Sequence, residues 1–268
     1  MNDRHADGRP IARPAPPLRS VAALAALELR LTARRGENVL VTLVIPAAVL
    51  LFFGGVAVPP GLPARPVDHL LPGTIALAIV AAGLVNLGIA TAYERSYGVL
   101  KRLGGAPLPR WGLLLAKAGA LLALEVIQVL VLVAVAVVAF GWAPGPGWSP
   151  ILATVAIVLG TFAFTALGLL LAGTLRAEAT LALANGLFLA FLMLGGLVVP
   201  VEQLPSFLKP VATALPATAL ADLLRIALDS GLPVEPGGAG TAVGPLVIVA
   251  GWGLCAAALA ARFFRWDG

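Results

Sequence analysis

The sequence is poor in the residues on which most protein chemistry depends. Its 268 residues include one cysteine, Cys255, and two histidines, His5 and His69. A single cysteine excludes a disulfide within the chain and a cluster of metal-binding thiolates. His5 lies in the polar N-terminal segment and His69 lies between two apolar runs, so we expect no H-E-x-x-H zinc motif, no pair of haem ligands and no Ser-His-Asp set. We therefore expect no catalytic residues, metal or cofactor on this chain, and we predict that Cys255 is a small buried apolar residue.

Charged residues are scarce as well. They make up 12% of the chain, whereas hydrophobic residues make up 60%; soluble domains have roughly 25% and 45–50%. The excess occurs in long runs with few charges, as a hydrocarbon layer about 30 Å thick requires of a helix. No polar stretch is longer than about 40 residues, and domains usually need more than about 50. The sequence also lacks the G-x-x-x-x-G-K-[ST] pattern of an ATP-binding loop. These features predict an all-α polytopic membrane protein without an ATPase site.

Six apolar segments are long enough to span a membrane. They cover residues 38–58, 70–92, 111–140, 151–175, 180–199 and 243–263. We therefore interpret residues 38–268 as one transmembrane domain of six helices.

The segment before the first span divides into two parts. Residues 1–17 are rich in proline and charge, which predicts a disordered cytoplasmic tail. In residues 18–37, apolar side chains recur every three or four positions among arginines, which favours an amphipathic helix lying on the membrane surface. The alternative is a simple extension of the first span.

Residues 200–242 differ from the other segments. They contain six prolines, too many for one continuous span. Asp222, Arg225 and Asp229 follow at helical spacing among leucines, which predicts an amphipathic helix over residues 215–228. We interpret the segment as an external re-entrant hairpin whose backbone packs against protein rather than lipid.

The basic residues are distributed unevenly between the two sides of this topology. One side holds Arg4, Arg9, Arg13, Arg19, Arg30, Arg34, Arg35, Arg95, Lys101, Arg102, Arg110, Lys117, Arg176, Arg262 and Arg265; the other holds Arg65, Lys209 and Arg225. By the positive-inside rule, both termini are cytoplasmic. Because these residues flank spans rather than forming a stripe with aromatic residues, we expect the lipid bilayer as a partner and no nucleic acid.

The connection between the second and third spans, residues 93–110, carries the most informative pattern. It resembles the cytoplasmic motif of ABC-2-type transport permeases, roughly E-R-E-x-G-T-L-K-R-L-x-x-x-P-L-P. The match consists of Glu94, Arg95, Gly98, Leu100, Lys101, Arg102, Leu103, Pro107, Leu108 and Pro109. Ser96 and Val99 depart from the pattern, so an acidic contact at position 96 is not expected.

The resemblance implies a function and a set of partners. It implies a bacterial plasma-membrane exporter of the drug- or antibiotic-efflux kind, moving an amphipathic drug-like or lipid-linked substrate outward. It further implies a second permease subunit, identical or not, and a separate ATP-binding-cassette ATPase subunit that binds ATP and Mg. In such permeases the motif couples the ATPase to the spans, which assigns coupling to Glu94, Arg95, Gly98, Leu100, Lys101, Arg102 and Leu103.

Other interpretations remain open at the level of sequence. The basic residues of the motif could instead set topology and contact anionic lipid headgroups. The chain could be an ion-coupled secondary transporter, although such carriers commonly show internal repeats and several intramembrane charges. A membrane scaffold without transport activity is a third alternative.

One ionisable residue stands out inside a span. Glu125 follows Lys117 by eight residues, which is about 12 Å along a helix, and Gln128 lies three residues further on. Intramembrane carboxyl groups are costly, so Glu125 and Gln128 are candidates for a substrate pathway. The alternative is that Glu125 is hydrogen-bonded to another helix or protonated because it is desolvated.

Overall fold

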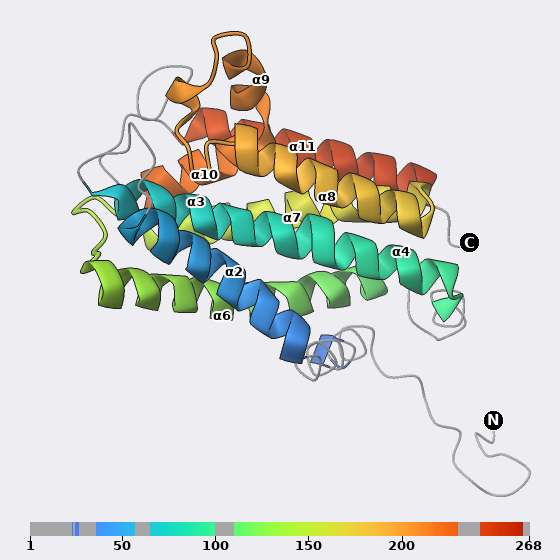
Figure 1. The fold of residues 1–268 in the computed structure, drawn as a ribbon. Helices are drawn as coiled ribbons and strands as arrows, with labels where there is room; N and C mark the ends of the chain where they lie inside the picture. The colour runs from blue at the N-terminus through green and yellow to red at the C-terminus, as the bar shows by residue number, and fades with distance from the viewer. Residues whose placement is uncertain are drawn as a thin grey trace, which may run out of the picture.

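The chain folds into a bundle of long helices (Figure 1). The computed structural model describes residues 23, 25, 26, 36–56, 65–99, 110–229 and 242–264. Within these ranges every regular element is helical: α2 (Gly36–Gly55), α3 (Pro66–Val80), the π-helical segment η1 (Ala81–Leu87), α4 (Gly88–Ser96), α6 (Arg110–Phe140), α7 (Pro150–Thr174), α8 (Ala177–Leu194), the 3-10 turn η2 (Val201–Gln203), α9 (Lys209–Ala214), α10 (Pro216–Ala227) and α11 (Val243–Phe263). The all-α prediction is confirmed for these residues. The predicted tail and most of the predicted interfacial helix lie outside them.

In the part of the chain that the structure describes, five helices are long and apolar enough to cross a membrane. They are Pro66–Ser96, which joins α3, η1 and α4, and Ala116–Phe140, Pro150–Thr174, Ala177–Leu194 and Val243–Phe263. They correspond to the second to sixth predicted spans. The first predicted span corresponds to α2, whose described apolar stretch, Leu43–Val56, is too short to count as a crossing. The sixth crossing therefore stays a prediction, and α2 is the helix that would supply it.

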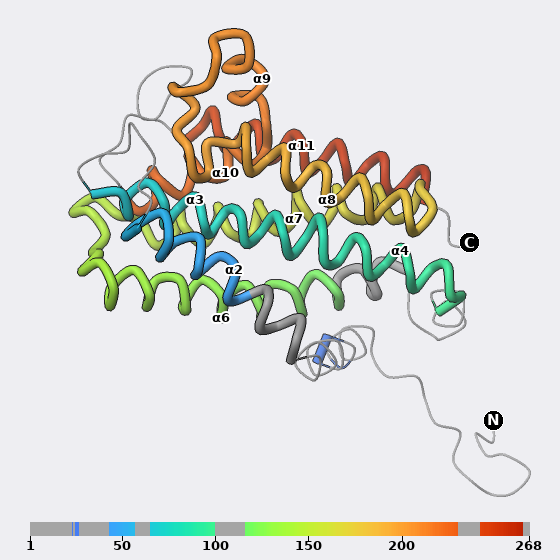
Figure 2. Tube along the Cα trace, viewed as in Figure 1, coloured from blue at the N-terminus to red at the C-terminus, as the bar shows by residue number. Residues whose placement is uncertain are grey.

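The bundle has two distinct ends (Figure 1). At the first, which we name the motif end, lie the C-terminal end of α4, the start of α6, the turn between α7 and α8, and the C-terminal end of α11. At the opposite end, which we name the hairpin end, lie the start of α3 and the loop between α6 and α7, whereas α9 projects from the side of the bundle next to α10 and α11. In Figure 2 the chain rises from α8 through η2 and α9 and returns into the bundle as α10.

The helix formed by α3, η1 and α4 lies close against α7. A Cβ atom added to Gly168 of α7 would lie 2.4 Å from the carbonyl oxygen of Gly83, and one added to Gly88 would lie 3.0 Å from the Cα atom of Gly168. No larger residue fits there without movement of the backbone. Three glycines thus permit the close crossing on which the position of α4 depends.

The helix α10 is buried inside the bundle rather than lying on its surface. It packs against α3, α7 and α11, and the side chains of Leu220 and Leu223 are completely buried. The predicted amphipathic helix over residues 215–228 is therefore present, with its backbone packed on protein as expected. Its depth relative to the bilayer stays a prediction, and residues 230–241 of the predicted hairpin lie outside the described ranges.

The polar stripe of α10 faces other helices instead of solvent. The Arg225 Nη1 atom lies 2.7 Å from Asp222 Oδ1, and Nη2 lies 3.2 Å from His69 Nε2 of α3. Nη2 also donates a hydrogen bond of 2.5 Å to the carbonyl oxygen of Gly196, just after α8. Burial raises the pKa of the Asp222 carboxyl, and the adjacent guanidinium opposes that rise. We name these four residues the Arg225 cluster; it attaches α10 to α3 and to the end of α8.

A second set of polar contacts holds the end of α10. The backbone N–H of Gly147 donates to Asp229 Oδ2 at 2.7 Å, and that of Ser149 donates to the carbonyl oxygen of Ala227 at 2.7 Å. Both donors lie in the loop between α6 and α7. The hairpin end is therefore held together by polar groups from α3, α10, the segment just after α8 and the loop between α6 and α7.

The prediction that Cys255 is buried is wrong, because its side chain is exposed on α11. Leu254 beside it is 63% exposed. On a helix that spans a membrane, apolar side chains face lipid as readily as protein, so apolar character does not indicate burial.

The Arg225 cluster yields a prediction for stability. Arg225→Met should destabilise the protein by about 3–5 kcal/mol, because it leaves the Asp222 carboxyl buried without its charged partner. The double variant D222L/R225M removes both charges and should recover most of the loss. Thermal unfolding of the purified chain in lipid nanodiscs measures both effects. Equal stability of the single variant and the wild type would contradict the prediction.

Candidate functional site

The motif that the sequence singled out begins at the end of α4. This helix ends at Ser96, and the backbone N–H of Gly98 donates to the carbonyl oxygen of Arg95 at 3.0 Å. Gly98 has φ +69°, and a Cβ atom added to it would meet no atom of the described residues within 4 Å. The backbone conformation, rather than close contact, therefore favours glycine at this position.

Arg95 points into the bundle. Its side chain is 8% exposed, and Nη2 donates a hydrogen bond to the carbonyl oxygen of Leu175, the residue that follows α7. This carbonyl lies at the C-terminal end of a helix, where the helix dipole favours a positive charge. The two residues are 80 positions apart, so the bond joins α4 to the turn between α7 and α8.

Glu94 makes a second attachment, to α6. The Lys117 Nζ atom lies 2.8 Å from Glu94 Oε2 and donates to Oε1 at 3.0 Å. The Lys117 side chain is 6% exposed and that of Glu94 is 29% exposed, so the pair is shielded from solvent more than a surface salt bridge. Two consecutive motif residues thus bind the last turn of α4 to two different parts of the bundle.

The residues just after these anchors face outward. Tyr97 is 73% exposed and Val99 is 38% exposed. The Tyr97 ring stacks on that of Tyr93, with the ring centroids 6.1 Å apart. We name residues 97–99 the exposed tip. The motif residues Leu100, Lys101, Arg102 and Leu103 lie outside the described ranges.

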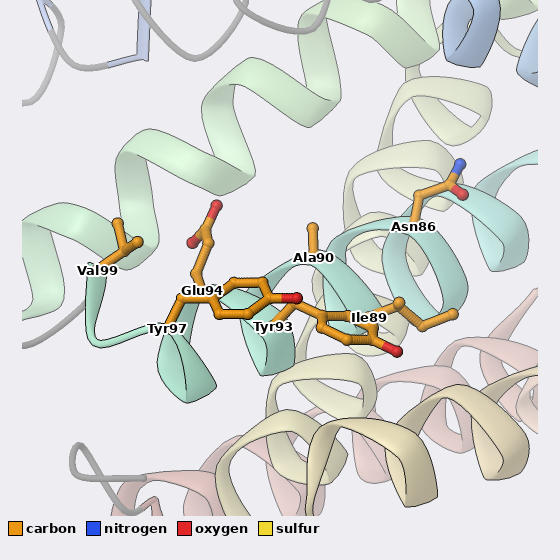
Figure 3. A pocket seen from close by; sticks show the side chains of 7 residues that line it. All are labelled: Asn86, Ile89, Ala90, Tyr93, Glu94, Tyr97 and Val99. Atoms are coloured by element: carbon orange, nitrogen blue, oxygen red, sulfur yellow. The ribbon is translucent and has the colours of Figure 1, made fainter.

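A groove of about 470 Å³ runs along the same helix. It is lined by Asn86, Ile89, Ala90, Tyr93, Glu94, Tyr97 and Val99. The first five of these residues belong to η1 and α4, and Tyr97 and Val99 follow the end of α4. Figure 3 shows Asn86 and Glu94 extending to the same side of this helix. The groove begins at a π-helical segment, a feature that often accompanies functional positions in helices.

Glu125 and Gln128 lie away from this groove. Both side chains are 1% exposed, and the Glu125 carboxyl contacts the Thr161 hydroxyl of α7. The structure therefore places Glu125 in a contact between α6 and α7. The hypothesis that these two residues line a substrate pathway stays a prediction.

The sequence did not predict several residues that make these contacts. Lys117 is explained there by topology alone, and His69 has no second histidine near it. The partner of Arg95 is a backbone carbonyl, which no pattern of side chains predicts. Helical spacing did signal Asp222 and Arg225 as neighbours. Within the described ranges, no group of three or more His, Cys, Asp or Glu residues could hold a metal ion.

Comparison with known proteins assigns the chain to a family. A search of the curated proteins finds no match. A comparison with protein families matches residues 19–228 to the ABC-2 type transporter. The match covers α2 to α10, and thus includes the motif, the anchors of Arg95 and Glu94, and the Arg225 cluster. The chain therefore belongs to the ABC-2 type transporter family.

Proposed function

We propose that the chain is the permease subunit of an ATP-binding-cassette exporter. It moves an amphipathic drug-like or lipid-linked substrate outward, and a separate ATPase subunit binds ATP and Mg and supplies the energy. The family match supports the membrane component of such a transporter. The observation that carries the proposal is the end of α4, where the exposed tip follows two attachments to the bundle that are largely shielded from solvent.

The proposal gives different tasks to neighbouring motif residues. The exposed tip, continued by Leu100, Lys101, Arg102 and Leu103, contacts the ATPase. Glu94 and Arg95 are anchors that pass its movement to α6 and to the α7–α8 turn. We assign these different roles from the solvent exposure of the side chains, because that of Arg95 is buried and that of Tyr97 is exposed.

The proposal also fixes the orientation of the chain. Fifteen of the eighteen Lys and Arg residues belong to segments that the topology places on the side of the motif end. The positive-inside rule therefore puts the motif end in the bacterial cytoplasm and the hairpin end outside.

A second permease subunit completes the transporter in this proposal, in a homodimer or a heterodimer. Large apolar side chains on α6 and α11 are exposed, including Val138 at 86% and Val247 at 65%, and such a face suits either lipid or a second subunit. Mass measurement in lipid nanodiscs with the ATPase bound should find two permease subunits in each complex. A complex with one permease subunit and full ATP-driven transport would contradict the proposal that the transporter contains two permease subunits.

Cysteine labelling tests the orientation. Ser96→Cys places a thiol at the motif end, and Trp148→Cys places one in the loop between α6 and α7. In intact cells a membrane-impermeant maleimide should label position 148 and leave position 96 unlabelled until the cells are opened. Labelling of position 96 but not of position 148 in intact cells would show that the topology is inverted. A cytoplasmic ATPase could then not contact the motif.

Substitutions in the exposed tip test docking. Tyr97→Ala removes a large exposed aromatic contact, and loss of such a contact at an interface costs about 2 kcal/mol, or roughly 30-fold in affinity. Gly98→Val should also weaken binding, because a positive φ costs a β-branched residue about 1–2 kcal/mol. The dissociation constant between the permease and the ATPase that co-purifies with it measures both effects.

Phe207 provides the matched control. It is 75% exposed, close to the 73% of Tyr97, but lies in the turn between η2 and α9, in a different part of the chain from the exposed tip. Phe207→Ala should leave ATPase affinity unchanged. If substitutions at 97, 98 and 207 all leave affinity unchanged, the tip does not dock the ATPase.

A further inference from the structure

Glu125 occupies a position in which the ordinary ionised state of a carboxyl group is unfavourable. It lies on a membrane-spanning helix, eight residues beyond Lys117, and its side chain is 1% exposed. Gln128, about one turn further along α6, is equally buried. A carboxylate removed from water needs a positive partner or several hydrogen-bond donors to offset its lost hydration.

No positive partner is present among the described residues. The ion pairs there are Arg65 with Asp68, Lys117 with Glu94, and Arg225 with Asp222. The Glu125 Oε1 atom is buried and has no hydrogen-bond partner in the same part of the chain. Among the described residues, the one hydrogen-bond contact of the carboxyl group is between Oε2 and the Thr161 hydroxyl of α7.

The number of protons in this contact identifies the donor. The Thr161 Oγ1 atom lies within hydrogen-bond distance of both Glu125 Oε2 and the carbonyl oxygen of Ile157, the latter at 2.7 Å. A hydroxyl group has one proton, and a carbonyl oxygen has none to donate. A helical threonine commonly donates to the carbonyl four residues earlier. The contact between Oγ1 and Oε2 then needs a second proton, and the carboxyl group is its source.

We propose that Glu125 is a proton-binding site. Its carboxyl group carries a proton on Oε2 and donates it to Thr161 Oγ1, and Thr161 donates its own proton to the Ile157 carbonyl. These two hydrogen bonds form a neutral connection between α6 and α7 inside the membrane. The proposal is independent of ATPase docking. It also implies that Glu125 offers no negative charge to a cationic substrate.

Infrared spectroscopy of the purified chain in lipid nanodiscs at neutral pH tests the proposal. A protonated carboxyl group has a C=O stretching band that a carboxylate lacks, and deuterium oxide shifts it. The wild type should show such a band and Glu125→Gln should lose it, while both proteins keep the same melting temperature within a few degrees. The amide retains an N–H donor for Thr161, so the connection survives without the acid.

Glu178→Gln is the matched control, since it makes the same change at an exposed side chain at the start of α8. This substitution should leave the band unchanged. Thr161→Val removes the acceptor without removing the acid, so it should move the band while keeping its area. A wild-type spectrum that matches E125Q would overturn the proposal. A band that T161V leaves in place would overturn the assignment of Thr161 as the acceptor.

Discussion

The buried hydrogen bond from Arg95 to the Leu175 carbonyl is the interaction on which the proposed mechanism depends. A guanidinium group is costly to bury, and here it is directed at the C-terminal end of α7, where helix carbonyls and the helix dipole stabilise positive charge. The neighbouring pair of Glu94 and Lys117 holds the same turn of α4 against α6. Because of these two attachments, a force on the exposed tip acts on three helices rather than on a flexible loop.

The helix that carries Arg95 also reaches the opposite end of the bundle. His69 lies near its start and Arg95 near its end, 26 residues later, which corresponds to about 39 Å along a helix. His69 belongs to the Arg225 cluster, which holds α10. Between the two, η1 crosses α7 at Gly83 and Gly168 with no room for a side chain. One helix therefore connects the motif end to the hairpin end, and we infer that it transmits movement between them.

Much of this arrangement could be predicted from the sequence. Long apolar runs predict the five described helices that are long enough to cross a membrane, because the thickness of the hydrocarbon layer sets the minimum length of such a run. The helix over residues 215–228 was predictable from residue spacing, and the resemblance of residues 93–110 to a family motif indicated the family. The partners were not, because the Leu175 carbonyl, the contact of His69 with Arg225 and the contact of Thr161 with Glu125 join residues far apart in the chain. Apolar periodicity also fails to separate protein-facing from lipid-facing sides, which is why the prediction that Cys255 is buried is wrong.

The most direct test of the central claim separates binding of the ATPase from transmission of its movement. Arg95→Leu removes the attachment to Leu175 without altering the exposed tip, and Arg65→Leu at the hairpin end is the control. The measurement is the rate of ATP hydrolysis by the reconstituted complex, relative to the isolated ATPase, together with the affinity between the subunits. The account predicts that R95L binds the ATPase as the wild type does but loses most of the change in rate that the permease causes, whereas R65L is normal in both. An R95L complex that binds and regulates hydrolysis as well as R65L would show that the anchor does not transmit movement.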